Sequence, residues 1–141
     1  MKVNNEFRIA QEKIIKGLPA ANHEKISFQD VFTARQLKLT REELQSYLIY
    51  IDEAGERLRR SRSFQDLARY KRLIKQFIQT AVDSGLALEK HPSQNRLLQL
   101  IETIDQKLLE LTDEVLYKEK GNLHLLALIG EIKGLLINLY I

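Results

Sequence analysis

Apolar residues recur at alternating steps of four and three along residues 94–118. The positions that share this spacing are Leu97, Ile101, Ile104, Leu108, Leu111 and Val115. Such steps place side chains on one face of an α-helix, because the helix turns once every ~3.6 residues. A long apolar face must be covered by other helices to leave water. The segment therefore predicts a helix that packs lengthwise against other helices.

Three further segments, residues 41–60, 63–88 and 123–140, place their apolar residues in the same way. These residues are Leu44, Leu48, Ile51, Gly55 and Leu58, then Leu67, Tyr70, Ile74, Phe77, Ala81 and Leu88, then Leu125, Ile129, Ile132, Leu136 and Leu139. At about 1.5 Å per residue the four helices would be roughly 28–38 Å long. Matched lengths and short connections predict an all-α fold, an antiparallel up-and-down four-helix bundle.

Hydroxyl residues three positions before an acid predict where helices begin, because both side chains can bond the free N–H groups there. The pairs are Ser27 with Asp30, Thr40 with Glu43, and Ser63 with Asp66. The first pair predicts a short extra N-terminal helix over about residues 28–36. The second and third predict the starts of the helices over 41–60 and 63–88.

The domain organisation follows from the position of these signals. Residues 1–26 contain Gly17, Pro19 and Asn22, which interrupt any helical pattern, and we predict a flexible N-terminal tail. Residues 27–141 are predicted to form a single helical-bundle domain, as the chain length favours one domain.

Glycines inside two of the predicted helices indicate close packing. Gly55 lies in the apolar seam of its helix, and Gly130 and Gly134 lie one turn apart in the last helix. A residue without a Cβ lets a neighbour come near the backbone. We therefore expect close contacts at all three positions.

The sequence contains no recognisable catalytic or metal-binding pattern. It has no cysteine, which excludes disulfides, thiol nucleophiles and zinc–thiolate sites. His23, His91 and His124 are far apart, and no glutamate stands three residues before any of them. The motifs of nucleotide-binding loops and serine hydrolases are absent. We predict a protein that is not an enzyme and has no cofactor or metal.

We predict a cytoplasmic protein with no membrane partner. The N-terminal residues lack the apolar core of a signal peptide. Glu131, Lys133 and Asn138 interrupt the apolar C-terminal segment, so no apolar run approaches the ~20 residues that span a bilayer. This segment is expected to be a buried helix.

Positive charge is concentrated between Arg57 and Lys75. Eight basic residues and one acid give this stretch a net charge of +7, whereas the whole chain carries +3. The candidate residues for binding a partner or an anion are Arg57, Arg59, Arg60, Arg62, Arg69, Arg72 and Lys75. Exposed ion pairs contribute only ~0–1 kcal/mol each, so stability alone explains such a concentration poorly.

Two interpretations of this cluster remain open. The charges can keep a helix soluble and pair with nearby acids, or they can bind an acidic partner or phosphates. Within the second interpretation, an unknown protein partner is our leading hypothesis, and nucleic acid bound by the same cluster is the alternative. The wide apolar face of the last helix leaves room for a homo-dimer.

The chain also resembles the YaaR-like family of bacterial proteins. The similarity lies in GERLRRSRSFQDLARYKRLIKQFIQTAV, IETIDQKLLELTDEVL and IGEIKGLLINLYI, and covers about residues 27–141. The loop EKHPSQN is shorter than the family's usual connection. The resemblance implies a helical bundle in a bacterial cytoplasmic protein, with no assigned activity and no known site residues to carry over.

Overall fold

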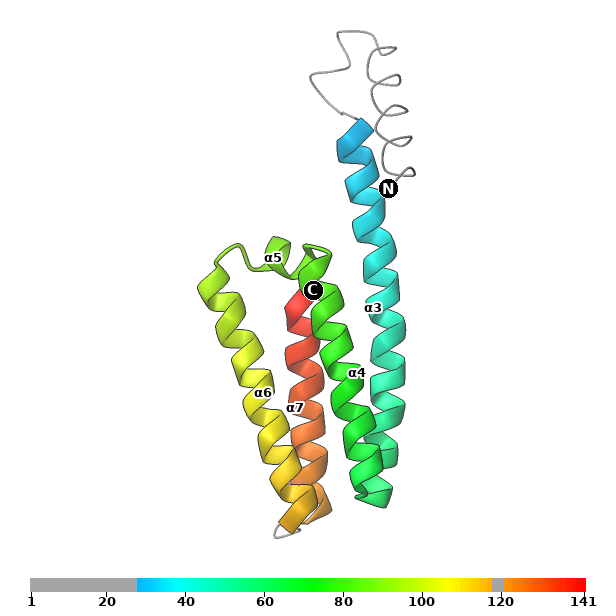
Figure 1. Cartoon of the computed structure of the whole chain (residues 1–141), viewed down its shortest axis with the longest axis vertical. Helices are drawn as coiled ribbons and strands as arrows, with labels where there is room; N and C mark the ends of the chain where they lie inside the picture. Colours follow the sequence, from blue (N-terminus) through cyan, green and yellow to red (C-terminus); the bar gives the residue numbers. More distant parts are fainter. Residues whose placement is uncertain (1–27, 118–120) are drawn as a thin grey trace, which may run out of the picture. The chain divides into compact units, whose positions relative to one another are not determined.

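The computed structural model describes residues 28–117 and 121–141 and places most of them in five α-helices (Figure 1). The helices are α3 (Phe28–Ser61), α4 (Phe64–Asp83), α5 (Leu86–Lys90), α6 (Gln94–Tyr117) and α7 (Asn122–Tyr140). These residues include no β-strand, which confirms the all-α class. The predicted tail, residues 1–26, lies outside the described residues.

The chain divides into two compact units, Met1–Leu39 and Thr40–Ile141. The division falls within α3, a helix of 34 residues. The first unit is described only from Phe28 onward, where it is helical. The buried core residues that the structure describes all lie in the second unit. That residues 27–141 form one domain stays a prediction.

Helix α3 is continuous, so the predicted break between a short helix over residues 28–36 and a long one over 41–60 is wrong. The residues that join the two, Leu37 to Thr40, include no glycine or proline, and leucine and lysine are good helix formers. The hydroxyl of a capping residue such as Thr40 accepts hydrogen bonds from the backbone N–H groups of the next turn only where no preceding carbonyl bonds them. Helical residues before Thr40 supply those carbonyls, so the capping motif starts no helix.

Helix α4 ends at Asp83, short of the predicted end at Leu88. Gly85 has a φ of 87°, a left-handed conformation that costs a side-chain-bearing residue roughly 1–2 kcal/mol and that stops the helix. The chain then turns into the short helix α5, which buries Leu86 and Ala87 and leaves Leu88 exposed. The prediction missed this turn because Gly85 falls inside an otherwise helical pattern.

The remaining helix boundaries agree with the sequence. Helix α6 starts after Ser93, whose Oγ accepts a hydrogen bond of 3.4 Å from the Arg96 N–H. Helix α4 starts after Ser63, whose Oγ accepts one of 3.2 Å from the Asp66 N–H. Helix α7 begins after Gly121, with no side-chain cap.

The predicted seams form the core of the Thr40–Ile141 unit. Side chains that are no more than 2% exposed come from all four long helices: Leu44, Ile51 and Leu58; Tyr70, Ile74 and Phe77; Ile104 and Leu111; and Leu125, Ile132 and Leu136. The rings of Phe77 and Tyr140 meet edge to face, with centroids 5.6 Å apart. Seam positions Leu48, Ile101 and Ile129 are half-buried.

Helix α7 is the most apolar of the described helices. By length and composition alone it is suited to cross a membrane. Its residues Leu125, Leu128, Ile132 and Leu136 are buried against the other helices of the unit. A third of its apolar window is buried in the structure.

The expected close contact exists at Gly55 and not at the other two glycines. A Cβ on Gly55 would lie 3.2 Å from the Ile129 Cγ2 and 3.2 Å from the Tyr70 Cε1. Apart from its chain neighbours and the nearby backbone of α7, no described atom lies within 4 Å of a Cβ built on Gly130 or Gly134. The prediction for these two is wrong because they lie on the exposed side of α7.

Tyr70 is fully buried, and its hydroxyl has no hydrogen-bond partner in the part of the chain that the structure describes. Burial raises the pKa of the phenol far above its usual value, and the charge of Asp52 adds to this. The protonated form is thus strongly favoured in the folded protein.

We predict that Gly134→Ala raises the free energy of unfolding by about 0.5–1 kcal/mol, because alanine loses less backbone entropy in a helix. Gly55→Leu should lower it by about 1–3 kcal/mol through overpacking against Ile129 and Tyr70. Urea denaturation of both variants measures these changes. A loss of stability in Gly134→Ala would contradict the open space at that position.

We also predict that Tyr70→Phe leaves stability near pH 7 unchanged or raises it by up to about 1 kcal/mol, because the buried hydroxyl is unpaired. The raised folded-state pKa means that the wild type loses stability as pH rises above the unfolded value of 10.0. Urea denaturation at about pH 8 and about pH 11 should show Tyr70→Phe losing less over this interval. Equal losses in both proteins would contradict the burial of the phenol.

Candidate functional site

The predicted basic stretch forms the end of α3, a two-residue connection and the start of α4, as the sequence indicated. The connection is Arg62–Ser63. Arg62 has a φ of 49°, the one positive φ among the described non-glycine residues. This conformation reverses the chain within two residues and aims the Arg62 side chain at α6 and α7.

Arg62 is bound inside its own unit. Its Nη1 donates to the Asn122 Oδ1 at 3.1 Å, and its Nη2 donates to the Glu114 Oε1 at 3.3 Å. The side chains of Arg62 and Glu114 are only 16% and 6% exposed. Arg62 therefore ties the α3–α4 connection to the end of α6 and the start of α7, and it offers little surface to a partner.

Arg59 and Arg60 share the carboxylate of Glu56. The Arg59 Nη2 lies 2.5 Å from the Glu56 Oε1, and the Arg60 Nε lies 3.3 Å from the same oxygen. The hydrogen bond from Arg59 lowers the pKa of Glu56, and the same bond raises the pKa of Arg59. Part of the positive charge at the end of α3 is thereby neutralised.

The other candidates are exposed on the surface of α3 and α4. Arg57, Arg69, Arg72 and Lys75 make no ion pair with any described residue, and we refer to these four as the outer cations. Gly55 contacts Tyr70, which places Arg57 and Arg69 at the same level on adjacent helices. The structure thus separates the predicted cluster into a buried link, a locally paired group and four unpaired charges.

Two apolar side chains of α4 are exposed as well. Phe64, at the start of α4, is 63% exposed, and Val82, near its end, is 38% exposed.

Sequence reasoning gave no role to three exposed leucines of α6. Leu98, Leu109 and Leu116 are 57%, 62% and 44% exposed. Each of these leucines comes one residue after a member of the core seam, so the three repeat the spacing of the seam shifted by one position. This shifted repeat is the sequence signal that could have revealed them.

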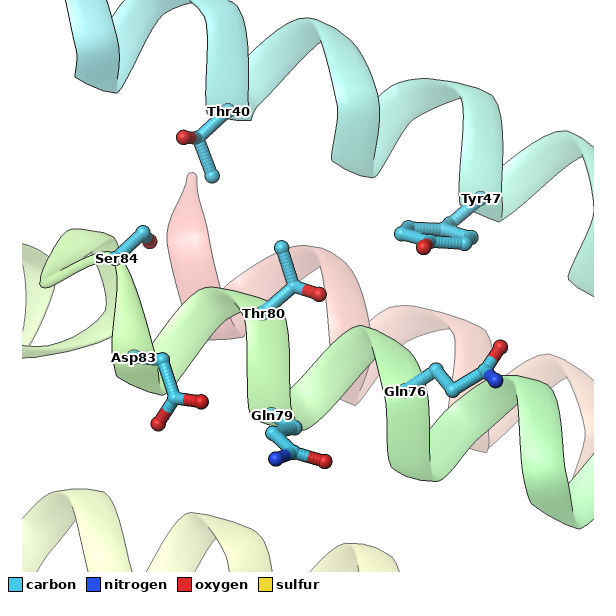
Figure 2. A pocket seen from close by; sticks show the side chains of 7 residues that line it. All are labelled: Thr40, Tyr47, Gln76, Gln79, Thr80, Asp83 and Ser84. Atoms are coloured by element: carbon cyan, nitrogen blue, oxygen red, sulfur yellow. The ribbon is translucent and has the colours of Figure 1, made fainter. Parts of the chain in front are cut away.

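One groove of the Thr40–Ile141 unit is lined mainly by neutral side chains. A groove of about 480 Å³ between α3 and α4 is lined by Thr40, Tyr47, Gln76, Gln79, Thr80, Asp83 and Ser84. Figure 2 shows Tyr47 and Thr80 pointing into the space between the helices, whereas Gln79 and Asp83 point away from α3. Residues 28–117 and 121–141 contain no group of three or more His, Asp or Glu placed to hold a metal ion.

We predict that Arg62→Ala lowers the free energy of unfolding by about 2–4 kcal/mol, because it removes one partner of a buried ion pair. Arg62→Gly should lose about 1 kcal/mol less, since glycine adopts the positive φ without strain. The control is Arg60→Ala, an exposed pair, with an expected change below about 1 kcal/mol. Urea denaturation of the three variants decides, and equal losses in Arg62→Ala and Arg60→Ala would contradict the role of Arg62.

Comparisons with known proteins place the chain in a family. A family described as "Protein of unknown function (DUF327)" matches residues 3–140. The uncharacterized protein YaaR of Bacillus subtilis is 42% identical, with 99% of each chain covered. The crystal structure of the uncharacterized protein BH1478 from Bacillus halodurans has a TM-score of 0.75 and 40% identity, covering 82% of this chain and 99% of its own. A designed granulopoietic protein, Moevan, has a TM-score of 0.66 and 31% identity, covering 74% of this chain and 94% of its own. The resemblance noted in the sequence is therefore confirmed, and the chain belongs to the YaaR-like family of proteins of unknown function.

Proposed function

We propose that this protein is a non-enzymatic cytoplasmic module that binds another protein through the outer cations. One observation carries the proposal: Arg57, Arg69, Arg72 and Lys75 are exposed and without ion pairs in the described part of the chain, while the neighbouring Arg59, Arg60 and Arg62 form ion pairs within it. Charges left unpaired on a rigid helical surface are available to an acidic partner, and they speed its association.

We further infer that the Thr40–Ile141 unit is an antiparallel up-and-down four-helix bundle. Support comes from the contacts at its two ends. At one end Arg62 bonds both Glu114 and Asn122. At the other, the His91 Nε2 lies 2.8 Å from the carbonyl oxygen of Asn138. In such a bundle, each connection would reverse the chain, and the outer surface of α4 would stay free for a partner.

A cytoplasmic location accords with this proposal. The chain has no cysteine, so it gains nothing from an oxidising compartment. The most apolar described helix, α7, buries Leu125, Leu128, Leu136 and Leu139 against the other helices. The module would therefore act in water, on soluble partners.

We expect a pull-down from native lysate to lose specific partners when Arg57 and Arg69 are both changed to glutamate. These two sites lie at the same level on α3 and α4, and together they are half of the outer cations. The matched control is Lys90→Glu with Arg96→Glu, two exposed positions that give the same change in net charge. Identical partner lists for wild type, variant and control would refute the proposal.

The same variants test nucleic acid as the alternative ligand. Binding of phosphates would appear as retardation of duplex or single-stranded probes at low salt, and it would weaken steeply as salt rises because counterions are released. Retardation that is lost in Arg57→Glu/Arg69→Glu, without any protein partner, would replace the proposed function with this one.

A further inference from the structure

Helix α6 carries a second stripe of heptad spacing beside its core seam. Its members are Leu98, Glu102, Asp105, Leu109, Thr112 and Leu116, at steps of +4, +3, +4, +3 and +4. All except Thr112 are exposed, and Thr112 is half-buried. A helix with two such stripes suits packing against two sets of neighbours, and only one set lies among residues 28–117 and 121–141, which the structure describes.

Helix α4 carries a matching stripe of opposite charge. Its members are Ala68, Arg72, Lys75, Gln79 and Val82, at steps of +4, +3, +4 and +3. All five are exposed, and the charged members are both basic. The charged members of the α6 stripe, Glu102 and Asp105, are both acidic. None of these four charges forms an ion pair with a described residue.

One cavity fixes the relative height of the two stripes. Val82 of α4 and Leu98 of α6 line the same apolar cavity of 270 Å³, together with Leu88 and Ile101. Lys75 lies seven residues before Val82, and Asp105 lies seven residues after Leu98. Seven residues rise by about 10.5 Å in a helix. If α4 and α6 run in opposite directions, as in the proposed bundle, Lys75 and Asp105 lie at the same height.

We propose that the face formed by these two stripes binds a second copy of this chain, with a two-fold axis that runs along the helices. This inference rests on the proposed function, because it names the partner of Arg72 and Lys75. Rotation about such an axis sets α4 of one copy against α6 of the other at unchanged height. Lys75 of each copy then meets Asp105 and Glu102 of its partner, and Leu98, Leu109 and Leu116 leave water.

Charge decides between a second copy and other arrangements of the same face. A two-fold axis across the helices would place α4 against α4 and bring like charges together, which is unfavourable. The axis along the helices pairs basic with acidic residues twice, so the face is complementary to itself, as an isologous interface requires.

The size of the face indicates a weak dimer. Two neighbouring helices about 30 Å long and together about 20 Å wide offer roughly 600 Å² per copy, somewhat below the ~800 Å² of a standard interface. We therefore expect a Kd on the order of micromolar. The outer cations Arg57 and Arg69 lie outside the stripes and remain free for a different protein.

The test is sedimentation equilibrium of the full chain and two charge-reversed variants. Arg72→Glu/Lys75→Glu makes both stripes acidic, and Glu102→Lys/Asp105→Lys makes both basic. We expect each variant alone to dimerise at least about tenfold more weakly than wild type, because like charges face each other. An equimolar mixture of the two should dimerise as wild type does, since every facing pair is again of opposite charge.

Two outcomes would overturn the proposal. One is a wild type that stays monomeric at concentrations of several hundred micromolar, and the other is a mixture no more dimeric than its components. Circular dichroism checks that the variants are folded. If either variant is unfolded, the dimerisation of Leu109→Ser, a change at an exposed position, tests the proposal instead. We expect the dimer of this variant to have a Kd at least about tenfold weaker than that of wild type.

The charge variant Arg57→Glu/Arg69→Glu separates this inference from the proposed function. It should dimerise as wild type does, because neither residue is in a stripe. A monomeric wild type that still loses lysate partners in this variant would refute the dimer and leave the proposed function standing. A variant that dimerises as wild type does and keeps the same lysate partners would refute the proposed function and leave the dimer standing.

Discussion

Burial of one apolar seam per long helix is the constraint on which the rest of the Thr40–Ile141 unit depends. Side chains such as Ile74, Ile104 and Ile132 gain about 1.5–3 kcal/mol each when they leave water, and only packing of the helices along their length removes all of them at once. This demand leaves the outer faces of the helices without a structural task. The unpaired charges of α4 and the exposed leucines of α6 therefore call for an explanation outside the core.

Internal pairing decides which basic residues can serve a partner. Glu56 pairs with both Arg59 and Arg60 and offsets one of their two charges, and Glu114 pairs with Arg62. The basic residues between Arg57 and Lys75 look alike in the sequence. In the folded protein they differ in whether an acidic side chain lies close enough to form an ion pair. The outer cations make no ion pair with a described residue, although Glu53 and Asp66 lie within one helical turn of Arg57 and Arg69.

The sequence allowed the helices and most of the core to be predicted, because periodicity is a local property that each helix carries by itself. It failed where two local preferences compete. Thr40 has the form of a cap, yet the helix continues through it, and Gly85 interrupts a pattern that otherwise favours helix. It also failed at Arg62, whose partners Glu114 and Asn122 are 52 and 60 residues away and become neighbours only when the helices pack. For the same reason, the pairing of the two stripes on α4 and α6 could not be read before the fold was known.

The position of Arg62 meets two demands that few residues can meet together. Its left-handed backbone favours glycine, which would forfeit the charge that Glu114 requires. Lysine would keep the charge, but its single ammonium group lacks the planar fork that reaches Glu114 and Asn122 at once. The positive φ and the bonds to Glu114 and Asn122 thus both restrict substitutions at this position. If Glu114 or Asn122 changes, the bonds that offset the backbone strain of Arg62 are lost. The three residues should therefore vary together in evolution, as a unit that is kept or replaced whole.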